Sequence, residues 1–248
     1  MTRRAVLHVV LALSAVAGCS AARPVPALSH ISAISFDRPT LRGSLFPADQ
    51  AVLSNEAIDR ILSAKIELPR EARLTVLHFG SRWRTPQWWS EPLAQLHESI
   101  DGGLLDTLRA SQRISDASFL PSLMTPERQT VSYLREAAAR FQADLLLVYY
   151  TTSQSHQKEK LLARNQVKAY CTAEAVLLDV RTGIVPFSSV VTRDVLVTES
   201  KDDFRFSETI ERAELEATNQ TVNQIAEELV HFLSTLPTIA SGGMGQPS

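Results

Sequence analysis

Cys19 follows a branched residue and two small ones, in the tetrapeptide Val16-Ala17-Gly18-Cys19, at the end of an uncharged apolar run. Arg3 and Arg4 precede this run. A basic start, an apolar centre and small residues at the end are typical of a signal peptide, so we expect residues 1–18 to be removed. The run is shorter than the roughly 20 residues that span a bilayer, and no second one follows, so the sequence predicts no transmembrane helix.

The small residues before Cys19 let an extended backbone lie close to the cysteine sulfur in a processing peptidase, and the tetrapeptide resembles the bacterial lipobox. We therefore predict that the Cys19 thiol carries a lipid. Simple secretory cleavage after Ala15-Val16-Ala17 is the alternative, and the Arg3-Arg4 pair leaves twin-arginine export open. Ser20 follows the cysteine where inner-membrane lipoproteins of proteobacteria often have Asp, so we expect attachment to the outer membrane, facing the periplasm.

Cys171 is the other of the 2 cysteines, so lipidation of Cys19 would leave it without a disulfide partner. Small and apolar residues alternate with polar ones from Val167 to Leu177. This period of two predicts a strand with Cys171 on its buried side. A structural role is the favoured interpretation, and a reactive thiol is the alternative.

His97 and Asp101 are four residues apart and would share one helix face. The segment begins like the H-E-x-x-H zinc motif but has Asp at the fifth position. Zinc needs three or four ligands, so we favour an exposed polar face and predict no metal and no cofactor. His78 lies at the end of a predicted strand, where open α/β sheets often place active sites, but a hydrogen-bonded structural histidine is the favoured interpretation. None of the nine glycines lies in a nucleophile-elbow, dinucleotide or P-loop motif.

All three tryptophans, Trp83, Trp88 and Trp89, lie in one loop between a predicted strand and a predicted helix. Tryptophan is enriched at binding hot spots, so this loop is our candidate interaction surface for a protein or a glycan. Two alternatives remain: the rings seal one end of the core, or they contact a membrane interface.

The formal net charge of −2 becomes −4 when Arg3 and Arg4 leave with the signal peptide, which argues against nucleic acid as a partner. Residues 19–50 contain scattered prolines and no periodicity, and we expect them to form a flexible tether with a span on the order of 30 Å. Residues 51–237 form the predicted folded domain, and the glycine-rich residues 238–248 a disordered tail.

Hydrophobic periodicity predicts an α/β domain in two or three layers with a single mixed sheet. The order is β-α-β-α-β-β-β-α, after a short leading helix and ending in a long C-terminal helix. We expect Ser54, Ser90, Thr125 and Ser207 to cap the four helices, and Gly183 to adopt a positive φ in a hairpin. The predicted strands are 73–79, 114–120, 144–150, 167–179 and 186–198, and 151–166 is a polar connection.

Three segments then resemble a known group: Arg73-Leu74-Thr75-Val76-Leu77, the run Arg140–Leu147 that contains Ala143-Asp144, and Ala175–Gly183 with its D-x-x-T-G ending. In order and spacing they look like periplasmic lipoproteins related to CsgG, LpoB and the N-terminal domain of TolB. The resemblance implies an envelope-facing interaction domain. It carries over no catalytic residue, because its motifs are structural.

Our leading hypothesis is an envelope-anchored lipoprotein with a non-catalytic periplasmic domain that binds another envelope protein or a cell-wall component. The second hypothesis is an oligomeric secretion or assembly subunit, but segments 151–166 and 190–206 are too polar or charged for membrane-spanning hairpins. The third is a cell-wall hydrolase without a recognisable motif, which would need a cleft with two carboxylates. The sequence alone leaves the oligomeric state open.

Overall fold

The computed structural model describes residues 44–46, 53–64, 66–69, 71–79, 90–158, 163–201, 203 and 205–237. All of them belong to one unit, residues 39–248. The succession of strands and helices confirms the predicted order. The elements are α1 (Asn55–Ser63), β1 (Ala72–His78), α2 (Glu91–Arg109), β2 (Ile114–Phe119), a 3-10 turn (Ser122–Met124), α3 (Val131–Arg140), β3 (Leu145–Lys158), β4 (Gln166–Asp179), β5 (Phe187–Thr198) and α4 (Phe206–Thr235).

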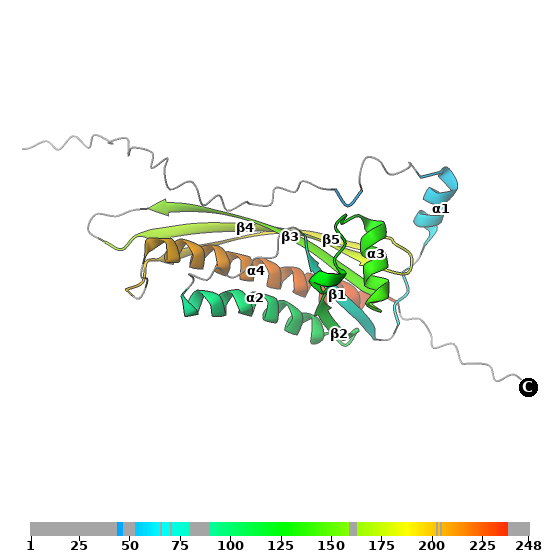
Figure 1. Ribbon diagram of the computed structural model, residues 1–248, viewed down its shortest axis with the longest axis horizontal. Helices are drawn as coiled ribbons and strands as arrows, with labels where there is room; N and C mark the ends of the chain where they lie inside the picture. Colours follow the sequence, from blue (N-terminus) through cyan, green and yellow to red (C-terminus); the bar gives the residue numbers. More distant parts are fainter. Residues whose placement is uncertain are drawn as a thin grey trace, which may run out of the picture. The chain divides into compact units, whose positions relative to one another are not determined.

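The five strands form one mixed sheet in the order β2-β1-β3-β4-β5. β1 pairs in parallel with both β2 and β3, because α2 and α3 return the chain to the same end of the sheet between these strands. β3, β4 and β5 follow one another along the chain and are antiparallel neighbours. The sheet therefore has a short parallel part and a long antiparallel part (Figure 1).

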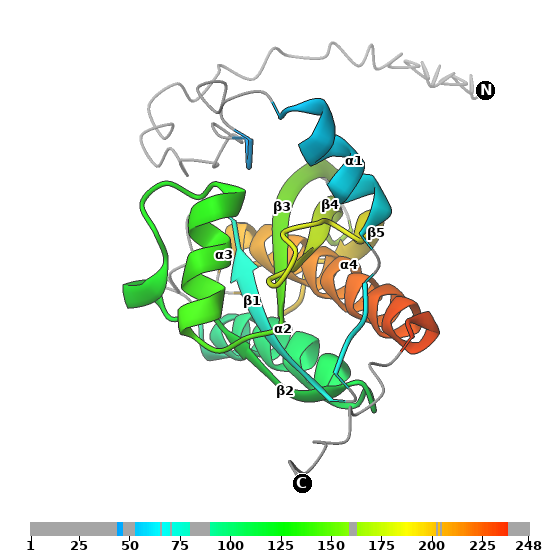
Figure 2. The same cartoon turned by 90° about the vertical axis from the view of Figure 1, so that its right-hand side faces the viewer.

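Helices cover the two faces of the sheet unequally. α2 and α4 run side by side along one face, where Val76 and Leu147 are buried with them (Figure 1). α3 lies on the opposite face, where Leu77 and Leu146 belong to a separate cluster (Figure 2). Successive residues of a strand point to opposite faces, so β1 and β3 contribute to both clusters, as the apolar run from Arg73 to Phe79 predicts.

β3 is twice as long as predicted, and the polar stretch after Tyr150 is largely strand. β3 pairs with β4 from Leu145 opposite Asp179 to Lys158 opposite Gln166. The extension is mostly exposed, and its half-buried residues Ser153 and Ser155 contact polar side chains of α4, where Ser155 Oγ donates to Glu214 Oε1 over 2.8 Å. The prediction was wrong here because it required apolar side chains of a central strand.

Two of the four predicted helix caps were displaced. Thr125 does not cap α3, because its hydroxyl donates to the carbonyl oxygen of Pro121 in the preceding 3-10 turn, over 3.2 Å. Thr130 takes the cap position of α3. Ser207 lies inside the first turn of α4, which has Arg205 at the cap position. Ser54, by contrast, accepts from the Ala57 amide as predicted.

Ser90 holds the cap position of α2 without a side-chain cap bond. α2 runs unbroken through its glycine pair. A Cβ on Gly103 would lie 3.2 Å from Asn223 Oδ1 on α4, so the glycine allows α2 and α4 to pack closely at this position. Among the helices that the structure describes, no long segment has the hydropathy required to cross a membrane.

Candidate functional site

The two histidines and the aspartate considered in the sequence meet at one cavity of about 290 Å³. His78 ends β1, and His97 and Asp101 lie one turn apart on α2. Other lining residues come from the sheet and from α4: Phe119, Tyr149, Thr151, Thr218 and Val222. Side chains from segments far apart in the sequence thus surround one space.

This cavity lies where β1 and β2 end before the neighbouring strand β3 does. β1 and β2 end together, with Val76 opposite Phe119, whereas β3 continues past Tyr149, the partner of His78. The strand ends leave room on the face that α2 and α4 cover. Ligand sites of open α/β sheets lie at the carboxyl ends of parallel strands, and this cavity has that position.

His78 is held in place by two contacts. Its ring stacks on Tyr149, with ring centroids 4.6 Å apart and planes inclined by 8°. Its Nε2 lies 3.2 Å from Thr151 Oγ1, and either atom acts as donor depending on the tautomer. The prediction of a hydrogen-bonded strand-end histidine is confirmed, and the same contacts fix one side of the cavity.

Two buried threonines make the floor of the cavity polar. Thr151 is 6% exposed and Thr218 5%. Thr218 Oγ1 donates to the Glu214 carbonyl over 2.8 Å and lies 3.3 Å from Ser153 Oγ. The same hydroxyl contacts Cys171 Sγ at 3.5 Å. Sequence analysis missed both threonines, although Thr218 lies one turn before Val222 on the buried side of α4, a position where a polar residue is unusual.

A second cavity, of about 250 Å³, lies at the same edge of the sheet. It shares His78 and Phe119 with the first one and includes Leu77, Ser122 and Gln129. The carboxyl ends of β1 and β2 are therefore hollowed beside the two shared side chains. No group of three metal-ligating side chains occurs among the described residues.

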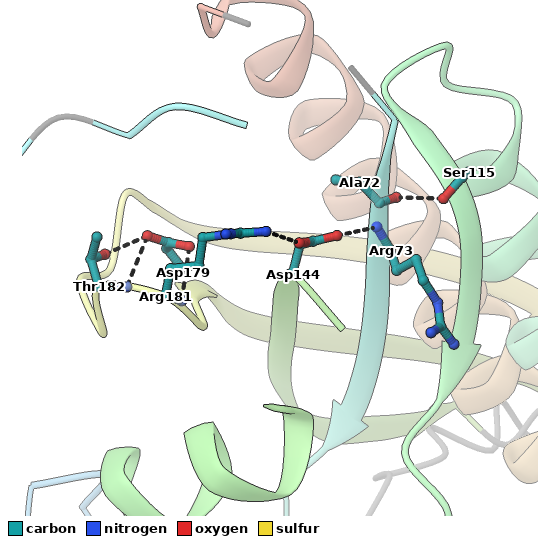
Figure 3. A network of polar contacts seen from close by, with 7 residues as sticks. All are labelled: Ala72, Arg73, Ser115, Asp144, Asp179, Arg181 and Thr182. Carbon is teal, nitrogen blue, oxygen red and sulfur yellow. Dashed lines mark hydrogen bonds and ion pairs between the residues drawn. The ribbon is translucent and has the colours of Figure 1, made fainter. Parts of the chain in front are cut away.

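The motifs that carried the family resemblance meet at a different place and hold the fold together (Figure 3). Asp144 Oδ2 accepts from the Arg73 amide over 3.0 Å, and its Oδ1 pairs with the Arg181 guanidinium over 3.1 Å. Asp179 accepts from the amide of Thr182 and from its hydroxyl. Gly183 has φ +80°, as predicted for the hairpin. These motifs are structural.

Cys171 is fully buried, which confirms its predicted place on the core side of β4. Cys19 and the three tryptophans, Trp83, Trp88 and Trp89, lie outside the described residues. The described chain stops at Phe79 beside the cavity and resumes at Ser90, the residue before α2. The segment that contains the tryptophans thus connects two elements that line the cavity.

Asp203 holds the start of α4 through hydrogen bonds from Thr209 and Arg212. Burial alone would raise the pKa of its carboxyl, but hydrogen bonds from Arg212, Thr209 and the Ser200 amide outweigh burial and lower it. Arg212 Nη2 lies 2.8 Å from Asp203 Oδ2. This buried pair stabilises the entry into α4 and lies away from the cavity.

No family model matches this chain, and no curated protein matches it. The chain is similar to three solved bacterial structures, among others. The PelC dodecamer from Paraburkholderia phytofirmans shares 18% identity over 66% of this chain and 91% of that one, with a TM-score of 0.32. A minor lipoprotein from Acinetobacter baumannii shares 9% identity over 67% and 96%, with a TM-score of 0.33.

A lipoprotein from Neisseria meningitidis shares 14% identity over 63% of this chain and 99% of that chain, with a TM-score of 0.28. The finer resemblance to CsgG, LpoB and TolB stays a prediction.

Proposed function

We propose that this protein is a lipid-anchored component of the bacterial envelope, and that its α/β domain binds another envelope component at the carboxyl ends of β1 and β2. The observation that carries the binding role is the cavity in which His78, His97 and Asp101 meet two buried threonine hydroxyls. A concave site with a few polar side chains among apolar ones is typical of a binding site.

The anchor follows from the sequence around Cys19. The expected product is a mature chain that begins with a lipidated Cys19 and reaches the domain through residues 20–50. Outer-membrane attachment is the finer part of this proposal and depends on Ser20. Mass spectrometry of the purified protein tests the lipid anchor. A diacylglyceryl-modified Cys19 at the N-terminus supports the anchor, and an unmodified N-terminus at Gly18 or Ser20 contradicts it.

The three tryptophans extend the proposed binding surface, because their segment joins β1 to α2. We expect Trp88→Ala combined with Trp89→Ala to weaken partner binding without loss of the fold. The alternative of an oligomeric assembly subunit predicts a large particle, which light scattering of the purified protein measures. A hydrolase is a weaker candidate, since Asp101 supplies the single carboxylate among the described residues that line the cavity.

Affinity capture from envelope extracts tests the binding role. The lipidated protein and its Asp101→Asn variant serve as baits, together with Asp106→Asn as the matched control. Asp106 is exposed on the same helix and pairs with Arg109 over 3.8 Å, away from the cavity. We expect a component that Asp106→Asn retains and Asp101→Asn loses. Equal capture by all three baits would remove the cavity from the binding surface.

A further inference from the structure

The larger cavity has a chemistry that selects among classes of ligand. We infer that it binds a single neutral sugar ring, which would make the envelope component of the proposed function a saccharide. This inference rests on that proposed function for its biological setting. Its physical basis is the combination of hydroxyl, imidazole, carboxylate and aromatic groups around a space of about 290 Å³.

The polar groups suit hydroxyl groups as ligands. Thr151 and Thr218 present hydroxyls at the floor, and His78 lies 3.2 Å from the Thr151 hydroxyl. Hydroxyls and neutral imidazoles each donate and accept hydrogen bonds. A sugar hydroxyl also does both, so it can join the Thr151–His78 pair in either direction, and it can donate to Thr218 Oγ1, whose own proton goes to the Glu214 carbonyl. The Asp101 carboxylate at the rim accepts only, and charge-assisted hydrogen bonds from hydroxyls to a carboxylate are strong ones.

Apolar walls complement this polar floor. Ile100 and Val222 are buried in the wall, and Phe119 is a half-buried aromatic that lines both cavities. A sugar ring has apolar C–H faces between its hydroxyl edges. It therefore fits a site in which aliphatic and aromatic side chains face polar ones.

Other classes of ligand fit less well. None of the nine described lining residues is Lys or Arg, and Asp101 would repel an anion. An apolar side chain from a partner protein would take the Asp101 carboxylate out of water without offering it a hydrogen bond, which is costly. The cavity volume lies at the lower end of the range for small-molecule sites. The cavity therefore accommodates one sugar ring, and the rest of a longer saccharide would continue outside it.

Ligand-observed saturation-transfer NMR on the mature, lipidated protein tests the inference. Glucose, galactose and N-acetylglucosamine are the probes, in a detergent without a sugar headgroup. A ligand of about a dozen heavy atoms in such a site is expected to bind in the millimolar range. We expect saturation transfer to at least one probe, and about tenfold weaker binding in Asp101→Asn, since hydrogen bonds to charged groups are the stronger ones.

Two further variants make the test specific. Thr151→Val removes a floor hydroxyl and keeps the side-chain shape, so it should also weaken binding, with circular dichroism as the check on folding. Asp106→Asn should bind as the wild type does. Absence of transfer to all three probes would overturn the inference, as would equal binding by wild type and Asp101→Asn. Either result leaves the anchor and the capture experiment intact, so the proposed function and this inference fail separately.

The same measurement separates two sources of the sugar. Disaccharides and tetrasaccharides of the binding monosaccharide are compared with it under identical conditions. Tighter binding of the longer saccharides identifies a polymer whose chain continues outside the cavity. Equal or weaker binding identifies a free sugar. Both outcomes support a sugar-ring site and differ only in its source.

Discussion

At the residue scale, Glu211 gives the domain a pH-dependent stability. It is half-buried on α4, and burial raises the pKa of its carboxyl, with Glu208 and Glu214 adding to the increase. The native state therefore binds this proton more tightly than the unfolded chain does. The resulting stability is present below the unfolded pKa, near 4.5, and is lost as pH rises through the raised native pKa.

Glu211→Gln removes the cost of ionising this half-buried carboxyl. We therefore expect the variant to have a higher melting temperature than the wild type at pH 7, and no higher melting temperature at about pH 4. Thermal unfolding at several pH values measures the difference. Glu227→Gln, an exposed position on the same helix, is the matched control. A gain for Glu211→Gln that is equal at both pH values would contradict the proposed cause.

Single residues differ in how far the sequence predicts their surroundings. Cys171 is predictable because its strand alternates small and polar residues, and that period places it in the core. The roles of Thr151 and Thr218 are not predictable, since the cavity that they line with His78 is formed by three segments of the chain. No local pattern encodes a cavity of this kind, which depends on where β1 stops relative to β3.

At the scale of elements, two glycines should respond to alanine in opposite directions. Gly183 has φ +80° in the β4–β5 turn, and a Cβ there would lie 3.3 Å from Arg135 Nη1. Gly183→Ala should lower the free energy of unfolding by about 1–2 kcal/mol, the cost of a left-handed residue with a side chain. Gly102 lies inside α2 with open space around it.

Gly102→Ala should therefore raise the free energy of unfolding by about 0.5–1 kcal/mol, since alanine favours the helix interior. Urea unfolding of the two variants, compared with the wild type, measures both effects. Equal destabilisation would show that the helix at Gly102 needs glycine for a reason other than backbone freedom.

The extent of an element proved harder to predict than its existence. Hydrophobic periodicity predicted all five strands, yet it ended β3 near Tyr150. The strand continues because β4 supplies backbone partners as far as Lys158, and because α4 places Glu214 and Thr218 beside the strand's polar side chains. Tertiary partners of this kind outweigh local propensity. The displaced cap at Thr125 has the same origin, since two threonines compete and the 3-10 turn uses one of them.

At the scale of the whole molecule, β3 joins the two main core clusters. Leu146 belongs to the cluster under α3, and its neighbour Leu147 belongs to the cluster under α2 and α4, together with Leu229. The two faces share the backbones of the same strands, so loss of packing on one face should disturb the other. We therefore expect a single cooperative unfolding transition for the described domain.

Leu146→Ala and Leu229→Ala test this coupling from opposite faces. Both side chains are fully buried, so each substitution should cost about 2–5 kcal/mol. Each should shift the same transition, with circular dichroism and differential scanning calorimetry in agreement. Leu123→Ala is the control, because Leu123 is fully exposed and its removal should change little. If Leu146→Ala instead produced a second, earlier transition while the α2–α4 side kept its melting temperature, the two layers would be independent and β3 would not couple them.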